Sequence, residues 1–252
     1  MHAANLARHP RAELAMVYDV LVFSIDDSPA GGKVTATVRA DNLNAGAQGA
    51  EEMAKRLATA PCAKDDSCIV LELQGALTTP NGLDRSKGFA DTLAKLAPKV
   101  QIIQRPTEWT ADMAADAAQN VLTQNPNLAG IFMASELMAS AINAQLKAAG
   151  KGAAVGEEGA VIRIAIDGTP QGLQLIRDKA LDATVSQPLS AYATKTAELI
   201  ELVHGGGTIE IGPRDDGQVI DTPVGPQYQL NATLVTSENV DSPDLWANQV
   251  GK

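Results

Sequence analysis

The sequence predicts an α/β fold built on parallel β-sheet, and two observations indicate it. Short apolar runs rich in Val and Ile alternate along the chain with longer segments of helical period. Strand–helix–strand repetition at this spacing requires right-handed crossovers and therefore parallel strands. Hydrophobic residues make up 45% of the 252 residues but aromatic residues only 3%, so the core must be aliphatic, as in buried parallel strands.

The pattern places each element. The runs that we expect to form strands are 20–25, 68–73, 100–103, 128–133, 161–166, 183–186 and 228–236. The segments that we expect to form helices are 50–58, 82–96, 111–123, 136–149, 171–179 and a long helix from about 190 to three consecutive glycines at 205–207. Thr169 and Pro170 are typical of an N-cap and a first helical position. Residues 208–225 are rich in Gly, Asp and Pro, and we expect a loop there.

Composition and charge narrow the class of protein. The net charge is −10 and the isoelectric point about 4.7, and no run of Lys and Arg offers a patch for phosphates. We therefore expect no nucleic-acid partner. No stretch of 18 apolar residues occurs, so we expect no transmembrane helix. The first twenty residues lack a basic segment followed by an apolar one, so we expect no signal peptide in this chain.

The two cysteines, Cys62 and Cys68, flank a short polar segment. Their spacing, without accompanying His or Cys pairs, is poor for zinc, and we expect no metal site. In an oxidising compartment the two cysteines form a local disulfide. The alternative is a pair of inert thiols, with Cys68 at the start of a buried strand.

Polar or aromatic side chains follow the ends of the predicted strands, which is where ligands bind in an open parallel sheet. They are Asp26, Asp27, Arg85, Trp109, Ser135, Asp167 and Gln187. Carboxylates accept hydrogen bonds from hydroxyl groups, Arg donates a planar fork, and an aromatic face covers the apolar side of a sugar ring. Each residue also has a structural interpretation: turn residues for the two aspartates, a surface ion pair with Asp84 or Glu72 for Arg85, packing for Trp109, helix caps for Ser135 and Asp167, and a hinge for Gln187.

Signals for an enzyme are weak. No glycine-rich phosphate loop, dinucleotide fingerprint or His-Glu-x-x-His motif occurs. The three histidines, His2, His9 and His204, do not follow predicted strands, which disfavours a Ser–His–Asp arrangement. Paired carboxylates such as Asp26 and Asp167 could act as acid and base, but nothing supplies a nucleophile or a metal. We expect a non-catalytic protein without cofactors.

Six segments together resemble the ribose-binding type of periplasmic sugar-binding protein. They are FSIDDSPAGGKVTATVRADN (23–42), ELQG (72–75), DRSKGF (84–89), TEWTADMAADAAQNVLTQNPNLAGIF (107–132), IDGTPQG (166–172) and ATVSQP (183–188). No single segment is specific, but their order and spacing are. The resemblance runs from about residue 18 to the C-terminus, and the ending LVTSENVDSPDLWANQ is similar to that of importers' binding proteins rather than of lactose-repressor-like regulators.

The resemblance implies which side chains contact a ligand. Carried over by position, the contacts are Asp26, Arg85, Trp109, Ser135, Asp167 and Gln187. The chain departs from ribose binders at two places: Ser135 stands where they have Asn, and Asp27 where they have Arg. Both departures change the hydroxyl pattern that is recognised, so the resemblance implies a small sugar or polyol without specifying which.

The resemblance also implies a fold of the type I periplasmic binding protein, with two Rossmann-like α/β lobes. Residues 1–40 and 189–227 would form an N-terminal lobe that is incomplete relative to the family, and 43–186 with 233–252 a C-terminal lobe. Hinge crossings are expected near 40–42, 187–188 and 228–232. The implied function is hinge closure on a sugar that is delivered to an ABC permease, in the periplasm or another extracytoplasmic space. The alternatives are the effector-sensing domain of a lactose-repressor-like regulator and a remnant that no longer binds ligand.

Overall fold

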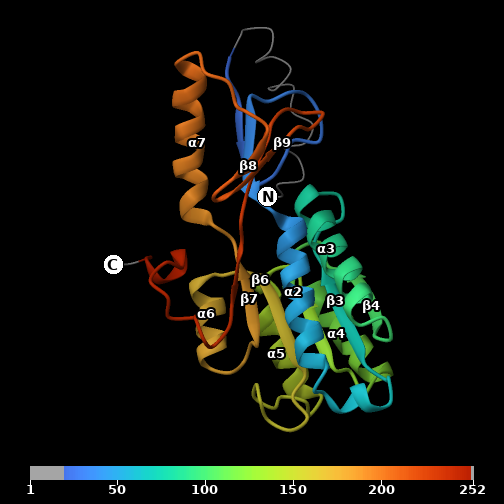
Figure 1. Cartoon of the computed structure of the whole chain (residues 1–252). Helices are drawn as coiled ribbons and strands as arrows, with labels where there is room; N and C mark the ends of the chain where they lie inside the picture. Colours follow the sequence, from blue (N-terminus) through green and yellow to red (C-terminus); the bar gives the residue numbers. More distant parts are fainter. Residues whose placement is uncertain (1–19, 251–252) are drawn as a thin grey trace. The chain divides into compact units, whose positions relative to one another are not determined.

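The computed structural model describes residues 20–250, and the chain divides into two compact units. Unit 1 comprises residues up to Asp41, Thr78–Pro80 and Pro188–Ala232; unit 2 comprises Asn42–Leu77, Asn81–Gln187 and the residues from Thr233 onward (Figure 1). The expectation about a signal peptide concerns residues that lie outside the described part. Within residues 20–250, no helix is long and apolar enough to cross a membrane.

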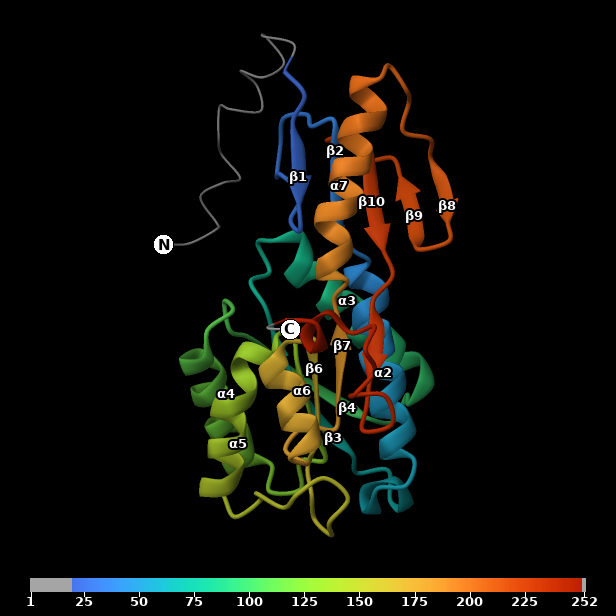
Figure 2. The same cartoon turned by 90° about the vertical axis from the view of Figure 1, so that its left-hand side faces the viewer.

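Unit 1 is a five-stranded sheet with one long helix against it. The strand order is β1 (Phe23–Ile25), β2 (Ala36–Ala40), β10 (Gln227–Leu230), β9 (Gly217–Ile220), β8 (Gly212–Arg214). β1, β2 and β10 run parallel, whereas β9 pairs antiparallel with both β10 and β8. Helix α7 (Leu189–His204) packs on β1 and β2, and the Tyr192 hydroxyl accepts the Ala40 amide at 2.8 Å. Figure 2 shows α7 lying along this sheet.

Three sequence expectations in this part of the chain are wrong. Residues 208–225 contain the β8–β9 hairpin, because β9 finds hydrogen-bond partners in β8 and β10 although the segment is rich in Gly, Asp and Pro. The strand expected at 228–236 is two strands in different sheets, β10 and β11 (Thr233–Val235), because the chain passes from one unit to the other between them. Strand β2 was not expected, yet it is fully buried between two parallel neighbours.

Unit 2 is a doubly wound α/β layer structure. Its sheet has the order β11, β7 (Ala183–Ser186), β6 (Ile162–Asp167), β5 (Gly130–Met133), β3 (Ile69–Gln74), β4 (Gln101–Pro106). All neighbours are parallel except β11, which pairs antiparallel with β7. Helices α2 (Asn42–Leu57) and α3 (Pro80–Leu96) lie on one face, and α4 (Ala111–Gln124), α5 (Ala139–Ala148) and α6 (Pro170–Arg177) on the other (Figure 2).

The helix boundaries follow local capping chemistry. Thr110 caps α4 by accepting the Met113 amide, and Thr169 caps α6 with Pro170 in its first turn, which confirms the predicted start of α6. Helix α2 begins at Asn42, eight residues before the expected 50–58 helix. It follows the unexpected strand β2 almost directly, because the Asp41 amide still donates to the Leu230 carbonyl of β10. The segment expected as one helix at 136–149 divides into a short 3-10 helix, Glu136–Met138, and α5.

Each face of the unit 2 sheet carries an apolar layer. Leu71, Leu73, Ile131 and Met133 point toward α4 and α5 in one continuous buried cluster. On the opposite face the rings of Phe89 (α3) and Phe132 (β5) stack with centroids 3.9 Å apart. Because successive side chains of a strand point to opposite faces of the sheet, Glu72 and Gln74 lie on the opposite face of β3 from Leu71 and Leu73, and both contact Ser86 of α3.

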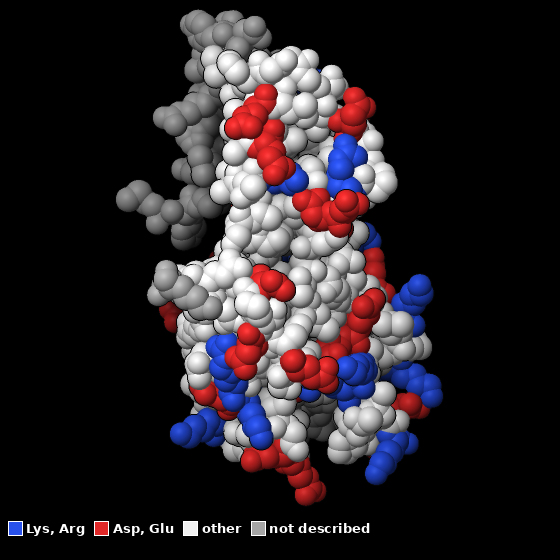
Figure 3. All heavy atoms as spheres, turned by 60° about the vertical axis from the view of Figure 1, so that its left-hand side comes forward, with Lys and Arg blue, Asp and Glu red and all other residues white. Residues whose placement is uncertain are grey.

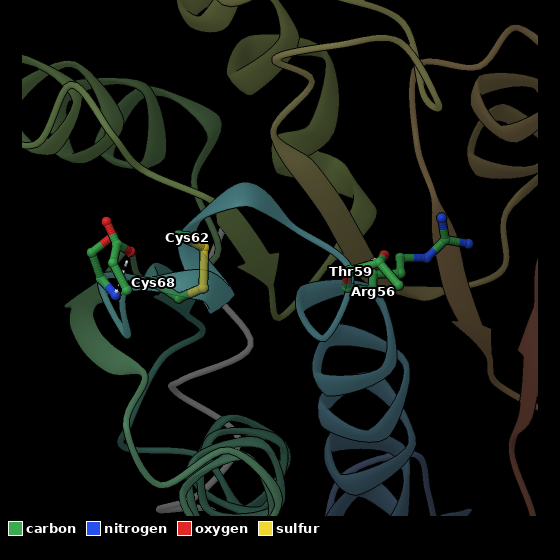
Figure 4. The surroundings of a disulfide bond; sticks show 6 residues. Arg56, Thr59, Cys62 and Cys68 are labelled. Carbon is green, nitrogen blue, oxygen red and sulfur yellow. Dashed lines mark hydrogen bonds between the residues drawn. A yellow bond between two sulfur atoms is a disulfide. The ribbon is translucent and has the colours of Figure 1, made fainter.

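The two cysteines lie at the amino end of β3, in unit 2. They form a disulfide that joins the 3-10 helix Pro61–Lys64 to the start of β3, with Cα atoms 4.9 Å apart (Figure 4). Of the two alternatives left by the sequence, the structure therefore shows the local disulfide. A pocket of about 310 Å³ lies at this same end, lined by Leu57, Cys68, Leu96, Lys99 and neighbouring alanines.

Candidate functional site

The candidate site lies at the carboxyl edge of the unit 2 sheet, opposite the disulfide end. Strands β5, β6 and β7 end side by side there because they are parallel neighbours. Asp167 is the last residue of β6, Gln187 follows β7 directly, and Ser135 follows β5 by two residues. Three side chains that are 20 to 52 positions apart in the sequence are thereby brought to one place.

Asp167 is the centre of the cluster. Its carboxylate accepts hydrogen bonds from the Ser135 hydroxyl at 2.6 Å and the Gln187 amide at 2.7 Å, and it pairs with the Arg85 guanidinium at 3.2 Å. Its side chain is 19% exposed, whereas that of Arg85 is 4% exposed. A carboxylate oriented by three donors, one of them charged, and still open to solvent can accept further hydrogen bonds from a polar ligand.

Arg85 is held by more than the carboxylate. Its Nε donates to Asn42 Oδ1 at 2.7 Å and one terminal nitrogen to the Ala134 carbonyl at 2.7 Å. Asn42 in turn donates to Asn81 Oδ1 at 2.9 Å. The guanidinium also lies 5.5 Å from the ring centroid of Trp109, within reach of a cation–π interaction. Arg85 is therefore a buried residue that pairs with Asp167, rather than part of an ion pair on the surface.

Close packing of α2 against α3 brings Asn42 and Arg85 together. A Cβ atom at Gly46 would lie 2.2 Å from the Arg85 carbonyl oxygen, and one at Gly88 would lie 2.0 Å from the Leu43 carbonyl oxygen. No side chain larger than hydrogen fits at either position without moving a helix backbone. The two glycines thus set the distance between the helices that carry the Arg85 side chain and its Asn42 partner.

Trp109 follows β4 and is half-buried. Its ring lies against Gly75, just after β3, where a Cβ atom would be 2.2 Å from the ring. The backbone at Trp109 has a φ of 63°, which L side chains adopt rarely. The structure thus places Trp109 beside Arg85 at the same edge of the sheet, and its expected role in stacking on a sugar ring stays a prediction.

Asp26 is the one predicted contact that belongs to unit 1. It follows β1, has a φ of 72° and donates its backbone amide to the Val38 carbonyl at 2.8 Å. Its side chain is exposed. Asp27, its neighbour, is half-buried, and its carbonyl accepts the Ser24 hydroxyl at 2.6 Å.

Sequence reasoning missed Asn42 and Asn81. Both are buried and belong to the network that holds Arg85. A signal existed for Asn42, because it comes two residues after β2, in the same relation to its strand as the other site residues. That strand was not expected, so the position was not considered.

Two buried carboxyl groups lie close to the cluster. Burial raises the pKa of Glu72, on β3, to about 7, against the hydrogen bonds of Ser86 and Gln104, which lower it. Burial likewise raises the pKa of Glu136, next to Ser135, with a further contribution from the charge of Asp167, whereas hydrogen bonds from Thr169 and Thr184 lower it.

Across residues 20–250, no group of three or more His, Cys, Asp or Glu side chains is arranged to hold a metal ion.

A sequence profile of the family described as periplasmic binding protein domain matches residues 13–207, more than half of the chain. The chain belongs to this family. Two curated proteins that are similar in sequence to this chain are named for the sugar that they bind. The chain is 27% identical over 194 residues to the D-allose-binding periplasmic protein of Escherichia coli, and 26% identical over 190 residues to the ribose import binding protein of Salmonella typhimurium.

The matches cover a larger share of this chain than of the two relatives. The matches take in 77% and 75% of this chain but only 58% and 59% of the relatives. The chain thus spans less than two thirds of the length of the curated relatives it matches.

Solved structures show the same fold. A galactofuranose-binding protein superimposes with a TM-score of 0.75 at 20% identity, covering 96% of this chain and 75% of the other. An ABC transporter solute-binding protein from Actinobacillus succinogenes, with bound D-allose, gives 0.73 at 22% identity, covering 92% and 73%. The expected type I periplasmic-binding-protein fold is therefore confirmed.

Proposed function

We propose that this chain is the substrate-binding component of a sugar ABC importer and binds a small sugar or polyol without transforming it. The observation that carries the proposal is the Asp167 carboxylate, oriented by Arg85, Ser135 and Gln187 beside Trp109 at the carboxyl edge of a parallel sheet. Adjacent hydroxyl groups on a sugar both donate and accept, and this cluster supplies an acceptor, donors and an aromatic face within one site.

The mechanism that we propose is closure of the two units on the ligand, with Asp26 as the contact contributed by unit 1. Apart from the short segment Thr78–Pro80, which belongs to unit 1, the chain passes between the units at Asp41–Asn42, Gln187–Pro188 and Ala232–Thr233. Gln187 is both a donor to Asp167 and the residue before one of these crossings. A ligand that binds the closed arrangement more tightly than the open one shifts the population toward it, and a membrane permease can recognise that form.

Two further observations support an extracytoplasmic transport protein. The Cys62–Cys68 disulfide is typical of proteins in oxidising compartments, and the relatives include a protein named periplasmic and several named as import binding proteins. On the face that Figure 3 shows, basic side chains are interspersed with acidic ones rather than gathered as a phosphate-binding surface.

The test is a thermal-shift screen of this chain against D-ribose, D-allose, L-arabinose, D-fucose and myo-inositol. A ligand present at about 100 times its dissociation constant stabilises the folded state by about 2.7 kcal/mol, which raises the melting midpoint of a chain of this size by several degrees, roughly 5–10 °C. We expect a shift with one or a few of these compounds. Incubated sugar should be recovered chemically unchanged.

Variants show whether the shift arises at the candidate site. Asp167→Asn and Arg85→Lys keep the volume of the side chain and should abolish the shift. Asp182→Asn is the matched control, because Asp182 is a buried carboxylate at the amino end of β7, where it accepts from Arg56 and from the Arg163 amide. A shift that survives Asp167→Asn would contradict the proposed site. Cooperative melting without a shift for any compound would instead identify a chain that does not bind these sugars.

A further inference from the structure

Glu136 is a buried carboxylate that the candidate site does not itself use. It comes directly after Ser135, in the short 3-10 helix that follows β5, and is 7% exposed. Its two oxygens accept four hydrogen bonds. The Gly168 amide donates at 2.9 Å and the Thr169 amide at 2.8 Å, and the hydroxyls of Thr169 and Thr184 donate as well.

Two of these donors are the backbone amides that follow Asp167. Asp167 has a φ of 143° and Gly168 a φ of 71°, so both residues have backbone conformations that L side chains rarely adopt. Such conformations persist only where the surroundings hold them. The turn is confined on its other side as well, because a Cβ atom at Gly168 would lie 2.2 Å from the Ser186 hydroxyl.

The first turn of α6 is shaped around the same carboxylate. A Cβ atom at Gly172 would lie 2.0 Å from the Glu136 carboxyl carbon, so α6 can approach this closely only with glycine at that position. The Thr169 hydroxyl donates to Glu136 and accepts the Gly172 amide, which joins the carboxylate to the helix cap. Glu136 therefore connects β7, through Thr184, with the turn that ends β6.

We propose that Glu136 is a positioning residue for the ligand site: it fixes the Gly168–Thr169 turn and so orients the Asp167 carboxylate, while Ser135 beside it holds that carboxylate directly. The inference rests on the proposed function, because a held carboxylate matters only if Asp167 contacts the ligand. Ser135 thus acts on the Asp167 side chain, and Glu136 acts on the backbone of Gly168 and Thr169, which follow Asp167.

The test combines carboxyl and amide NMR with ligand affinity in Glu136→Gln. The variant keeps the volume of the side chain but places an amide NH₂ where one oxygen accepts two donors, so at least one of the four hydrogen bonds is lost. We expect the Asp167 side-chain carboxyl resonance and the Gln187 side-chain amide resonance to move. Changing groups that hold a ligating side chain typically alters affinity 10–100-fold at metal sites, and we expect binding of D-ribose or D-allose, measured by calorimetry, to weaken about tenfold or more.

Glu52→Gln is the matched control. Glu52 is 3% exposed and accepts from Arg56 at 2.7 Å and Lys55 at 3.3 Å, so its change removes a buried carboxylate of unit 2 far from the turn. It should lower stability but leave the Asp167 and Gln187 resonances and the affinity unchanged, at a temperature below all melting midpoints. If Glu136 contributes only to stability, Glu136→Gln should likewise lower stability and leave the Asp167 and Gln187 resonances and the affinity unchanged.

Two outcomes would overturn the inference. One is a folded Glu136→Gln protein in which the Asp167 and Gln187 resonances keep their wild-type positions. The other, if that variant does not fold, is an unchanged pair of resonances in Thr184→Val, which removes one donor from Glu136 and keeps the side-chain shape. If the wild-type chain binds none of the five compounds of the thermal-shift screen, the proposed function fails, and the resonances still decide whether Glu136 positions Asp167.

Discussion

Backbone strain at the residue scale coincides with the predicted ligand contacts. Among residues 20–250, the non-glycine residues with positive φ are Asp26, Asp66, Glu108, Trp109, Asp167 and Lys179. Three of these six are predicted contacts, and a fourth is the neighbour of Trp109. Strained conformations are over-represented at functional sites because the surroundings hold side chains in arrangements that the backbone alone would not adopt. This agreement favours the site on grounds independent of family resemblance.

Glu72 should make the stability of the protein depend on pH. Its folded-state pKa is raised to about 7 from the ordinary 4.5, mainly by burial, and the Gln104 amide donates to it at 2.9 Å. The stabilising contribution is therefore complete below about pH 4.5 and is lost as pH rises toward 7, a total on the order of 3 kcal/mol. Glu136 and Asp182 add to the slope with the same sign.

Glu72→Gln should reduce that slope. We expect the unfolding free energy of the variant to fall less than that of the wild type between pH 5 and pH 7.5, measured by urea denaturation at several pH values. Asp91→Asn, at an exposed site on α3, should keep the wild-type slope. If the unfolding free energy depends on pH equally in wild type and Glu72→Gln, Glu72 is ionised in the folded protein throughout this range, which contradicts the prediction.

At the element scale, the site depends on how α2 and α3 approach each other. Asn42 and Asn81 begin these helices, and Arg85 is one turn into α3. Their hydrogen bonds require the close contact that Gly46 and Gly88 permit. A helix-forming preference would put alanine at both positions, so packing overrides local propensity here.

Gly88→Ala should destabilise the protein, although Gly to Ala in a helix usually stabilises by up to about 1 kcal/mol. The new Cβ atom would lie 2.0 Å from the Leu43 carbonyl oxygen, and overpacking of this kind costs about 1–3 kcal/mol. Urea denaturation is the measurement. Lys87→Ala, at the exposed neighbouring position, should change stability by less than about 0.5 kcal/mol. Equal or greater stability of Gly88→Ala would mean that the helices separate freely.

The disulfide is a second feature at this scale, since it closes the connection between α2 and β3. For so short a loop, the restriction of the unfolded chain is worth about 2 kcal/mol. We expect the double variant Cys62→Ala, Cys68→Ala to lose that amount and to melt at the same temperature with and without reductant. The wild type should lose a similar amount when reduced, and indifference of the wild type to reductant would contradict the prediction.

At the scale of the whole molecule, the two units differ in their cores. The described cluster of unit 1 is small, formed by residues such as Val38, Tyr192 and Leu230 with one helix over the sheet, whereas the described cluster of unit 2 joins several strands and helices. Among the strands of residues 20–250, β1 lies at the edge of its sheet, and Ile25 in it is 48% exposed. Edge strands and thin cores open at lower free energy than buried sheets.

We therefore expect backbone amides of unit 1 to exchange faster than those of unit 2. Hydrogen exchange followed by mass spectrometry should show protection in β3, β5 and β6 that exceeds protection in β1, β2 and β10. Strands β5 and β2 are the informative pair, because both are fully buried and central or near central in their sheets. Equal protection in the two units would indicate one cooperative structure.

The sequence by itself determined the class of fold, most strands and helices of unit 2 and the cap of α6, and it supplied Arg85, Trp109, Ser135, Asp167 and Gln187 as the predicted contacts of that unit. These follow from periodicity, capping and position after a strand, which are local properties. Only the tertiary structure decided that β2 is a strand, that β8 and β9 form a hairpin, and that 227–235 serves two sheets, because hydrogen-bond partners distant in the chain stabilise these segments. The hydrogen bonds of Asn42, Asn81 and Glu136 were decided in the same way, because the partners of a buried polar side chain are the donors and acceptors that folding brings to it.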